Sequence, residues 1–323
     1  MPGAYAQAKI NGGKNKRAAV HKTPLRKCVK RDIWLYLFLI IPILYFIIFK
    51  YGPMYGAIIA FKDFKLGMGI NGSPWVGLQN FRKLFVSPDF FSILRNTLLL
   101  NVYNVVFGFP APIILAILLN EIGHAAFKKT TQSLLYLPHF MSWVVLGGIF
   151  IQMLSPSTGV VNLILSKVFG VTPIYFMAST FWWPVMFVLS SIWEGAGWGS
   201  IIYLAAITGI DQEQFEAARM DGASKFQQIW HITLPGIKAT IAIMLILRMG
   251  SMMDIGFEQI YMLSNQAVYR VSDVISTYVY RVGIEGARYS YTAAIGLFQS
   301  VISMILVFTT NKIVQKMGET SLW

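Results

Sequence analysis

A polar segment between two apolar stretches carries the densest group of ionisable side chains outside the N-terminal region of this chain. Only 13% of the residues are charged, yet six ionisable residues fall between positions 211 and 225. They are Asp211, Glu213, Glu216, Arg219, Asp221 and Lys225. Neither a Ser–His–acid arrangement nor a paired-carboxylate motif accompanies them. The pattern therefore favours contact with another protein over catalysis.

The same segment predicts two short helices joined by a tight turn. Asp211–Met220 reads as one helix, because aspartate is a good N-cap and acidic side chains suit the first turns. Asp221-Gly222 should end it, since glycine tolerates the left-handed conformation common at helix ends. Ser224 can cap a second helix to about Ile232. We expect this element, called the elbow (residues 211–235), to project from a membrane.

The elbow resembles the signature of binding-protein-dependent ABC importer permeases. Glu216-Ala217-Ala218 is followed by three residues and Gly222, and nine residues later by Ile232-Thr233-Leu234-Pro235. Every position of the pattern EAA–x3–G–x9–I–x–LP is matched. In that family the loop holds a coupling helix that seats in a groove of the cytoplasmic ATPase subunit. The resemblance implies ATPase-coupling roles for Glu216, Ala217, Ala218, Asp221, Gly222, Ala223, Phe226, Leu234 and Pro235.

Other segments are similar to LplB-type polysaccharide-transport permeases, which belong with the maltose-type sugar permeases. They are Asn96-Thr97, Ser191–Glu194, Gly197–Ala206, Gly256–Tyr261 and Ser321–Trp323. The resemblance covers roughly residues 30–323 and implies an oligosaccharide or polysaccharide fragment as cargo. It also implies a second permease in a heterodimer, two ATPase subunits that bind ATP and Mg²⁺, and an extracytoplasmic solute-binding protein. This chain itself would need no cofactor.

Several polar side chains lie within apolar stretches, where charge is costly and usually functional. Sugars are bound by aromatic faces together with hydrogen-bonding groups in a concave site. We therefore predict a substrate path lined by Trp193, Glu194, Trp198, Arg248, Glu258 and Gln259. Arg248 would favour an acidic sugar through charge-assisted bonds. The alternative is that the tryptophans pack between helices and the charges pair with the partner permease.

Gly195 and Gly199 have GxxxG spacing, which more often serves the close packing of helices than a catalytic role. The four histidines are scattered and the chain has one cysteine, so no metal site is predicted. No GxxxxGK[ST] phosphate loop is present, and the chain is therefore not itself the ATPase. We expect a transport subunit and not an enzyme.

Composition indicates an all-α integral membrane protein. Of 323 residues, 55% are hydrophobic, which no ordinary soluble domain of this size shows. The net charge of +13 arises largely from residues 1–31, a basic tail before an apolar run. Such a flank sets orientation more often than it binds nucleic acid. We therefore expect a lipid-embedded, multi-pass protein of the cell membrane that does not bind nucleic acid.

Six transmembrane helices are predicted within a permease domain of residues 32–323, with the coupling loop (208–238) between spans four and five. Asparagines and prolines in the second span require it to face other helices. Residues 54–92 are expected to form an ordered loop with short helices, 160–171 a surface or re-entrant helix, and 264–288 a polar loop. The spans are about 33–51, 93–119, 133–154, 181–207, 239–263 and 289–310.

Charge predicts the orientation of these spans. Lys and Arg are more numerous on the side that includes the basic tail and the elbow, and the positive-inside rule makes that side cytoplasmic. Both termini would then be cytoplasmic. Two alternatives remain: a secondary transporter driven by an ion gradient, in which the intramembrane charges relay ions, and an ABC permease for a non-sugar cargo such as an amino acid or peptide. A homodimeric arrangement also stays open.

Overall fold

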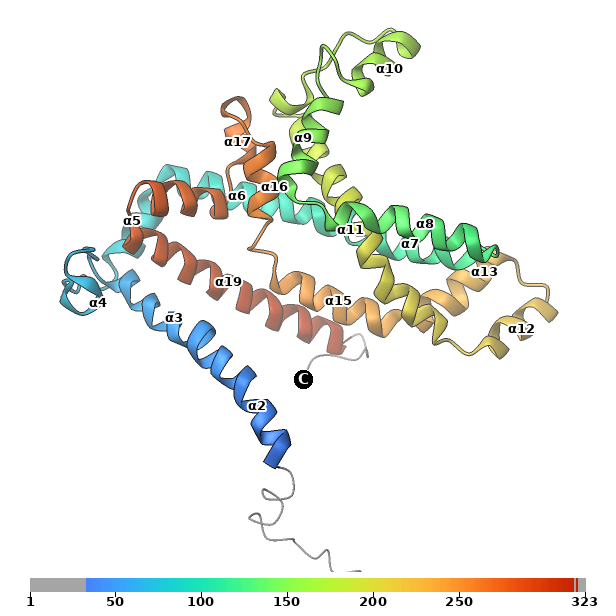
Figure 1. The fold of residues 1–323 in the computed structure, drawn as a ribbon, viewed down its shortest axis with the longest axis horizontal. Helices are drawn as coiled ribbons and strands as arrows, with labels where there is room; N and C mark the ends of the chain where they lie inside the picture. Colours follow the sequence, from blue (N-terminus) through green and yellow to red (C-terminus); the bar gives the residue numbers. More distant parts are fainter. Residues whose placement is uncertain (1–32, 317, 319–323) are drawn as a thin grey trace, which may run out of the picture. The chain divides into compact units, whose positions relative to one another are not determined.

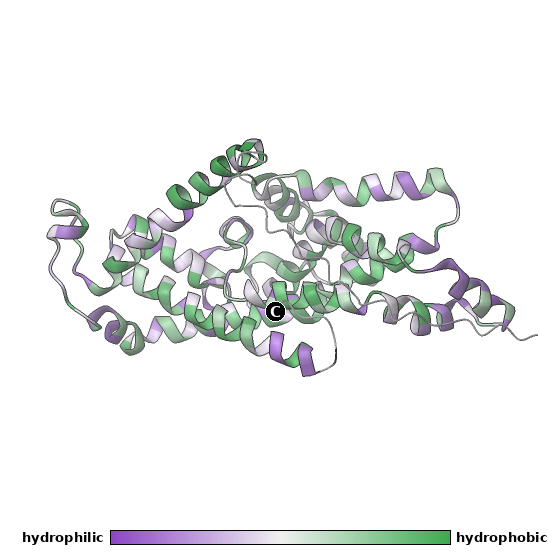
Figure 2. Ribbon diagram, turned by 90° about the horizontal axis from the view of Figure 1, so that it is seen from below, coloured by the Kyte–Doolittle hydropathy of each residue, from purple (hydrophilic) through white to green (hydrophobic). Residues whose placement is uncertain are grey.

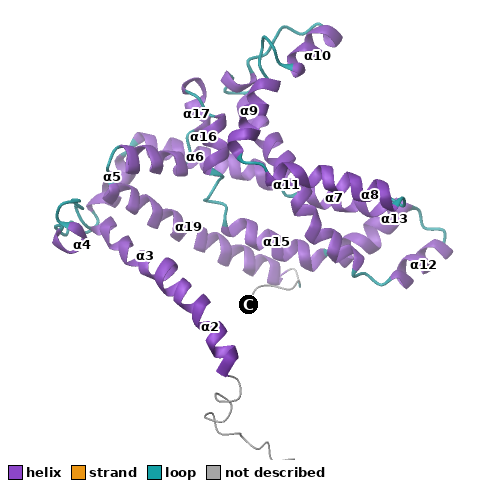
Figure 3. Ribbon diagram, viewed as in Figure 1, coloured by secondary structure: helices purple, strands orange, loops and turns teal. Residues whose placement is uncertain are grey.

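The computed structural model describes residues 33–316 and 318, and these residues are almost entirely helical (Figure 3). In that range the β pairing consists of one isolated bridge between Lys62 and Trp75. The predicted basic tail and the tripeptide 321–323 lie outside the described residues. The elements are α2 Ile33–Phe46, η1 Ile47–Tyr51, α3 Gly52–Met54, η2 Tyr55–Phe61, α4 Gly69–Gly72, α5 Gln79–Val86, α6 Pro88–Tyr103, η3 Asn104–Gly108, α7 Pro110–Glu121, α8 Ala125–Tyr136, η4 Leu137–Phe140, α9 Trp143–Met153, α10 Val160–Phe169, η5 Phe176–Ala178, α11 Trp182–Thr208, α12 Gln212–Met220, α13 Lys225–Gln228, η6 Ile229–Thr233, α14 Leu234–Gly236, α15 Lys238–Gly250, α16 Phe257–Leu263, η7 Gln266–Val268, α17 Tyr269–Ser272, α18 Ile275–Tyr278, η8 Val279–Glu285 and α19 Tyr289–Lys316.

The described residues up to Gly56 form one unit and residues from Ala57 onward form another. A helical run that begins in the first unit at Ile33 and ends at Phe61 is long and apolar enough to cross a bilayer. In α2 nearly every side chain is apolar, on all faces of the helix. A helix without a polar face belongs in a fully apolar environment, which here is lipid.

Three further helical runs can each cross a membrane: Pro88–Glu121, Trp182–Thr208 and Tyr289–Lys316. The first has 34 residues, more than the roughly 20 that span the hydrocarbon core. It stays continuous because the π-helical turn η3 precedes its prolines, and Phe109 N–H donates to Asn104 O at 2.9 Å. The proline without a backbone N–H thus falls where the next helical segment, α7, begins.

Two other spans are bent, which differs from the predicted continuous stretches. In the segment predicted as 133–154, the helical run Ala125–Phe140 meets α9 at 104°. The bend follows from Pro138 in a 3₁₀ turn and from extended backbone at Ser142. Depending on whether each bent pair is one span, residues 33–316 contain four to six candidate membrane helices.

The segment predicted as the fifth span, 239–263, also divides. Its first part, α15, ends at Gly250, and residues 251–256 form turns before α16 begins at Phe257. On the other side, α15 meets the helical run Lys225–Gly236 at 60°. A glycine and short polar residues at the break explain why the apolar pattern continued while the helix did not.

The long helix α11 is central to the second unit, where it packs against α7, α8 and several shorter elements (Figure 1). Gly197 makes the close approach to α8, because a Cβ built there would lie 2.0 Å from Leu135 O. Gly199 faces Pro112, whereas Gly195 has no heavy atom within 4 Å of that position. The predicted close packing of α11 is therefore centred on Gly197, between the two glycines of the GxxxG pattern.

Buried polar contacts connect α11 to α16. Trp183 Nε1 donates to Leu263 O at 2.9 Å, and both residues belong to a hydrophobic cluster. Most helical surfaces in this unit are apolar, and hydrophilic residues concentrate toward element ends and in α12 (Figure 2). This distribution suits helices held together within a bilayer with polar segments at its surfaces.

The segments predicted as loops contain short helices. Residues 54–92 include α4 and the amphipathic α5, and residues 160–169 form the ten-residue α10, as expected. Residues 264–288 are a correction, because they are not a simple polar loop but carry η7, α17, α18 and η8. These turns pack against the bundle through three fully buried apolar residues, Val268, Val274 and Ile275.

Candidate functional site

The elbow has the helix–turn–helix form expected from its sequence. The carboxylate of Asp211 accepts a hydrogen bond from Glu213 N–H at 3.0 Å and caps α12. Gly222 has a φ of +78°, the left-handed conformation that favours glycine. Ser224 and Gln227 form a reciprocal capping box at the start of α13. Local hydrogen bonds therefore fix the turn.

The predicted coupling residues lie mostly on the outer surface of the elbow. The side chains of Phe226 and Trp230 are 72% and 61% exposed and stack with ring centroids 6.3 Å apart. Met220, at the end of α12, is 89% exposed. Apolar side chains this exposed at a polar protein end are typical of a docking surface. Of the coupling set, Glu216, Ala217, Asp221, Gly222, Phe226 and Pro235 are exposed and Ala218, Ala223 and Leu234 are half-buried.

The elbow is attached to the membrane helices at three places. Lys225 Nζ lies 2.6 Å from Glu121 Oε2 at the end of α7. A Cβ on Gly236 would lie 2.6 Å from Ile210 Cδ1, so the base of the elbow packs closely on the end of α11. Leu234 contacts the apolar cluster centred on Tyr203 and Ile237. A force on the elbow is therefore transmitted to α7, α11 and α15.

A cavity of about 400 Å³ lies between η3, α7, α11 and α15. Two of the predicted path residues, Glu194 and Arg248, line it together with Asn104, Ser191 and Ser251. The Glu194 carboxylate is 2.8 Å from His139 Nδ1. The Arg248 guanidinium has no hydrogen-bond or ion-pair partner among the residues that the structure describes. A charged, unpartnered group facing a cavity between membrane helices is a candidate ligand contact.

The other predicted path residues do not line this cavity. Trp198 stacks on His139 with ring centroids 4.9 Å apart, and Trp193 packs edge-on against Phe150. Glu258 is exposed on α16. Gln259 is buried, and its Nε2 donates to Phe187 O at 2.9 Å and to Ser190 Oγ at 3.0 Å. The structure thus brings together Glu194 and Arg248 but not the two tryptophans, Glu258 or Gln259.

This geometry predicts that Gln259→Leu lowers stability without changing cargo preference. The substitution removes both hydrogen bonds that the Gln259 amide donates to α11, and each such bond contributes about 0.5–1.5 kcal/mol. Thermal unfolding of the detergent-solubilised protein should show a lower Tm. Glu258→Gln, one residue away and exposed, is the matched control and should unfold like the wild type. An unchanged Tm for Gln259→Leu, with altered cargo selectivity, would contradict the packing role.

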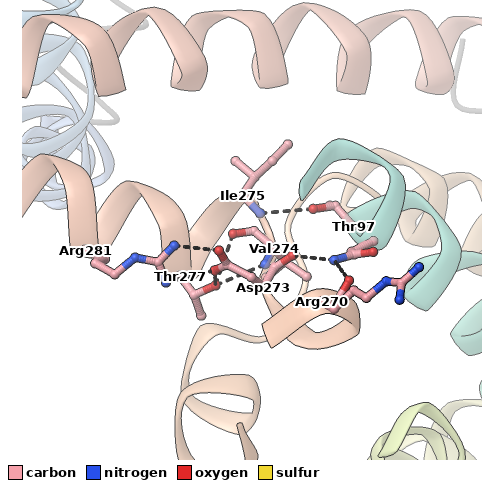
Figure 4. Close-up of polar contacts among 8 residues, drawn as sticks. Thr97, Arg270, Asp273, Val274, Ile275, Thr277 and Arg281 are labelled. Atoms are coloured by element: carbon pink, nitrogen blue, oxygen red, sulfur yellow. Dashed lines mark hydrogen bonds and ion pairs between the residues drawn. The ribbon is translucent and has the colours of Figure 1, made fainter. Parts of the chain in front are cut away.

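A second pocket, of about 430 Å³ and with a mainly polar lining, was not predicted from the sequence. It is lined by residues of α6 and of the segment 269–281. Asn96 Nδ2 donates to the backbone oxygens of Arg270 and Asp273, both at 3.0 Å. Ile275 N–H donates to Thr97 Oγ1 at 3.0 Å (Figure 4). Asn96-Thr97 is one of the segments that resemble polysaccharide-transport permeases, and the resemblance assigns it no function. Here the pair joins two segments that are 174 or more residues apart.

Asp273 organises the far side of this pocket. Its carboxylate accepts from Arg281 Nη2 at 2.6 Å, from Arg281 Nη1 at 3.3 Å and from Thr277 Oγ1 at 2.9 Å (Figure 4). These bonds raise the pKa of the Arg281 guanidinium above its ordinary value, although partial burial acts in the opposite direction. Arg281 therefore remains charged and fixed in place.

Comparison with known proteins identifies the family of the chain. Residues 90–319 match the family model described as the binding-protein-dependent transport system inner membrane component. The match covers more than half of the chain and includes the elbow, the bent spans and every residue of both pockets except Asp89. The chain belongs to this family. It is therefore a multi-pass inner-membrane component of a binding-protein-dependent transport system.

Individual relatives of this permease cover nearly its whole length. Protein LplB of Bacillus subtilis is 48% identical over 91% of this chain and 92% of its own. The polygalacturonan/rhamnogalacturonan transport system permease YteP of the same organism is 44% identical over 90% of each chain. A chain of a bacterial alginate ABC transporter, solved in complex with alginate pentasaccharide-bound periplasmic protein, superposes with a TM-score of 0.84 at 41% identity and covers 92% of this permease and 99% of that chain.

The family is a transport component, which is consistent with the expected transport subunit. Within residues 33–316, no group of three or more His, Cys, Asp and Glu side chains is placed to hold a metal ion. That ATP and Mg²⁺ bind to a separate subunit stays a prediction.

Proposed function

We propose that this chain is the permease subunit of an ATP-driven importer that moves oligosaccharides or fragments of acidic polysaccharide into the cytoplasm. The observation that carries the proposal is the elbow. Every residue of the EAA–x3–G–x9–I–x–LP pattern lies on a helix–turn–helix whose turn is fixed by a left-handed Gly222. Its outer surface exposes apolar side chains, and its base is attached to three membrane helices.

The cargo class is inferred from the relatives. YteP is named for polygalacturonan and rhamnogalacturonan, and the superposed structure is an alginate transporter. These names denote acidic polysaccharides. Arg248, which faces the central cavity, supplies a positive charge suited to a carboxylate. We therefore infer that the transported saccharide carries carboxylates.

The partners follow from the same proposal. Two ATPase subunits would bind the elbows of this permease and of a second permease, and an extracytoplasmic solute-binding protein would deliver the cargo. With the elbow on the cytoplasmic side, an even number of spans places both termini there as well. The domain assignment proposed is a basic cytoplasmic tail, residues 1–31, followed by the permease domain, residues 32–323.

Reconstitution of the importer tests the proposal. The permease pair, the ATPase and the binding protein are assembled in proteoliposomes, and uptake of a radiolabelled oligouronate is measured with ATP on the ATPase side. ATP-dependent uptake that requires the binding protein is expected. Uptake driven by an ion gradient without an ATPase would favour the secondary transporter. ATP-dependent uptake of an amino acid or peptide, with none of any saccharide, would refute the sugar assignment.

In the same assay, Arg248→Gln should reduce oligouronate uptake at least tenfold, because a charge-assisted pair contributes about 1.5–3 kcal/mol. Arg248→Lys keeps the charge but not the planar fork and should retain part of the activity. Arg82→Gln, an exposed change on α5 outside both pockets, is the control and should transport normally. Equal uptake by wild type and Arg248→Gln would remove Arg248 from the path.

A further inference from the structure

The polar pocket beside Asn96 lies at the opposite end of the membrane helices from the elbow. The run Pro88–Glu121 passes Arg95 near its start and ends at Glu121, which pairs with Lys225 of the elbow. At about 1.5 Å per residue, the two positions are separated by roughly 40 Å. Figure 1 shows α5 at one end of this run and α13 at the other. If the elbow is cytoplasmic, the pocket opens on the extracytoplasmic side.

The charges of this pocket are predominantly basic. Arg95, Arg270 and Arg281 line it with two acids, Asp89 and Asp273. Asp273 is fully engaged by Arg281 and Thr277. Arg95 donates to the amide oxygen of Asn96 at 3.3 Å, and neither Arg95 nor Arg270 forms an ion pair with a carboxylate among the described residues. Two guanidinium groups therefore remain available to an external anion.

The pocket wall is held rigidly. Asn96 and Thr97 are buried, and their side chains bond to the backbone at both ends of α17 and at the start of α18. The side chain of Arg270 is exposed while its backbone oxygen is held by Asn96. Arg281 lies 5.4 Å from the centroid of the Tyr269 ring, which also lines the pocket. A fixed backbone that carries free guanidinium groups next to an aromatic ring suits a saccharide.

This pocket shares two lining residues with a larger groove along the membrane helices. Arg95 and Asn96 also line an apolar groove of about 650 Å³, whose walls are Leu99, Tyr103 and Phe107 on one side and α11 residues on the other. Ile192 lines both that groove and the central cavity that contains Glu194 and Arg248. From the pocket through the groove to the central cavity, the lining residues change from basic to apolar and aromatic, and then to basic again at Arg248.

We propose that the pocket formed by Arg95, Arg270, Arg281 and Tyr269 binds a carboxylate-bearing sugar unit as it enters the permease. The proposal rests on the proposed saccharide transport and assigns the entry site of its cargo. Arginine binds carboxylates through its planar fork, and aromatic rings pack on sugar C–H faces. A concave pocket that shares part of its wall with an apolar and aromatic groove suits a transported ligand more than the flat contact of a docked protein.

The test uses the complete importer in proteoliposomes with its binding protein. In Arg95→Gln/Arg270→Gln, ATP-dependent uptake of an oligouronate should fall at least tenfold. The Kd of the binding protein for the importer should stay within about twofold of the wild type. The double lysine variant should recover part of the uptake. Arg82→Gln/Lys83→Gln removes two exposed charges of α5 outside the pocket and should behave as wild type.

The outcomes separate this inference from the proposed function. If the wild type imports oligouronate and the Arg95/Arg270 variant imports it equally well, the proposed entry site is wrong and the proposed transport function stands. A weaker Kd of the sugar-free binding protein, in proportion to the lost uptake, assigns the arginines to protein docking and overturns the proposal. Wild-type import of neutral saccharides alone overturns the acidic entry site, and import of no saccharide defeats both.

Discussion

Replacement of Gly222 by valine is expected to abolish ATP-driven uptake while the protein accumulates normally in the membrane. Gly222 has a φ of +78°, and a non-glycine residue in the left-handed region costs about 1–2 kcal/mol, more when it is β-branched. The space around it is open, with no heavy atom within 4 Å of a built Cβ. The valine is therefore expected to change the backbone conformation of the turn and not to clash with the membrane helices.

A changed turn would reorient α12, which carries Glu216 and Ala217, relative to α13, which carries Phe226. Binding-protein-stimulated ATP hydrolysis and uptake should be lost together. Gly123→Val is the matched control, because Gly123 also lies in a short connection with open space around it but has no positive φ. Normal uptake by Gly222→Val, at wild-type expression, would show that the rigid turn is not needed for coupling.

Gly197→Ala is expected to destabilise the folded protein more than any other single methyl group added to α11. The new Cβ would lie 2.0 Å from Leu135 O and 2.6 Å from Leu135 C. Both atoms belong to the backbone of α8, so no side-chain rotation can relieve the overlap. Overpacking of this kind costs about 1–3 kcal/mol or more, and α8 must move away from α11.

The control is Gly195→Ala on the same helix, where a Cβ meets no heavy atom within 4 Å. Thermal unfolding in detergent should show a Tm several degrees lower for Gly197→Ala and close to wild type for Gly195→Ala. Because alanine favours helix over glycine, the control is expected to be neutral or slightly stabilising. Equal Tm values for the two variants would contradict the close approach of α8 to α11.

The elbow was predictable from the sequence because its structure is local. The Asp211 cap, the Gly222 turn and the Ser224 cap each depend on residues a few positions apart, and the structure confirms all three. The breaks at Met141-Ser142 and after Gly250 were not predicted. Hydropathy continues across both, since a bent span buries the same kinds of side chain as a straight one.

The candidate site was predictable only in part. The cost of charge in a bilayer identified Glu194 and Arg248, which share a cavity. Residue type alone does not determine the rotation of each helix, so Trp193, Trp198 and Gln259 were grouped with Glu194 and Arg248 although they do not line the same cavity. The arginine pocket was missed because it joins α6 to residues near Asp273, far along the chain. Its one sequence signal was the Asn96-Thr97 pair.

The exposure of Met220 provides the most direct test of the central claim, that the elbow is the cytoplasmic contact for an ATPase. The single native cysteine is removed by Cys28→Ser, Met220→Cys is introduced, and a membrane-impermeant maleimide is added to sealed vesicles of either orientation. Labelling is expected only in inside-out vesicles stripped of ATPase, and rebinding the ATPase should protect the cysteine. Labelling in right-side-out vesicles, or no protection by bound ATPase, would contradict the claim.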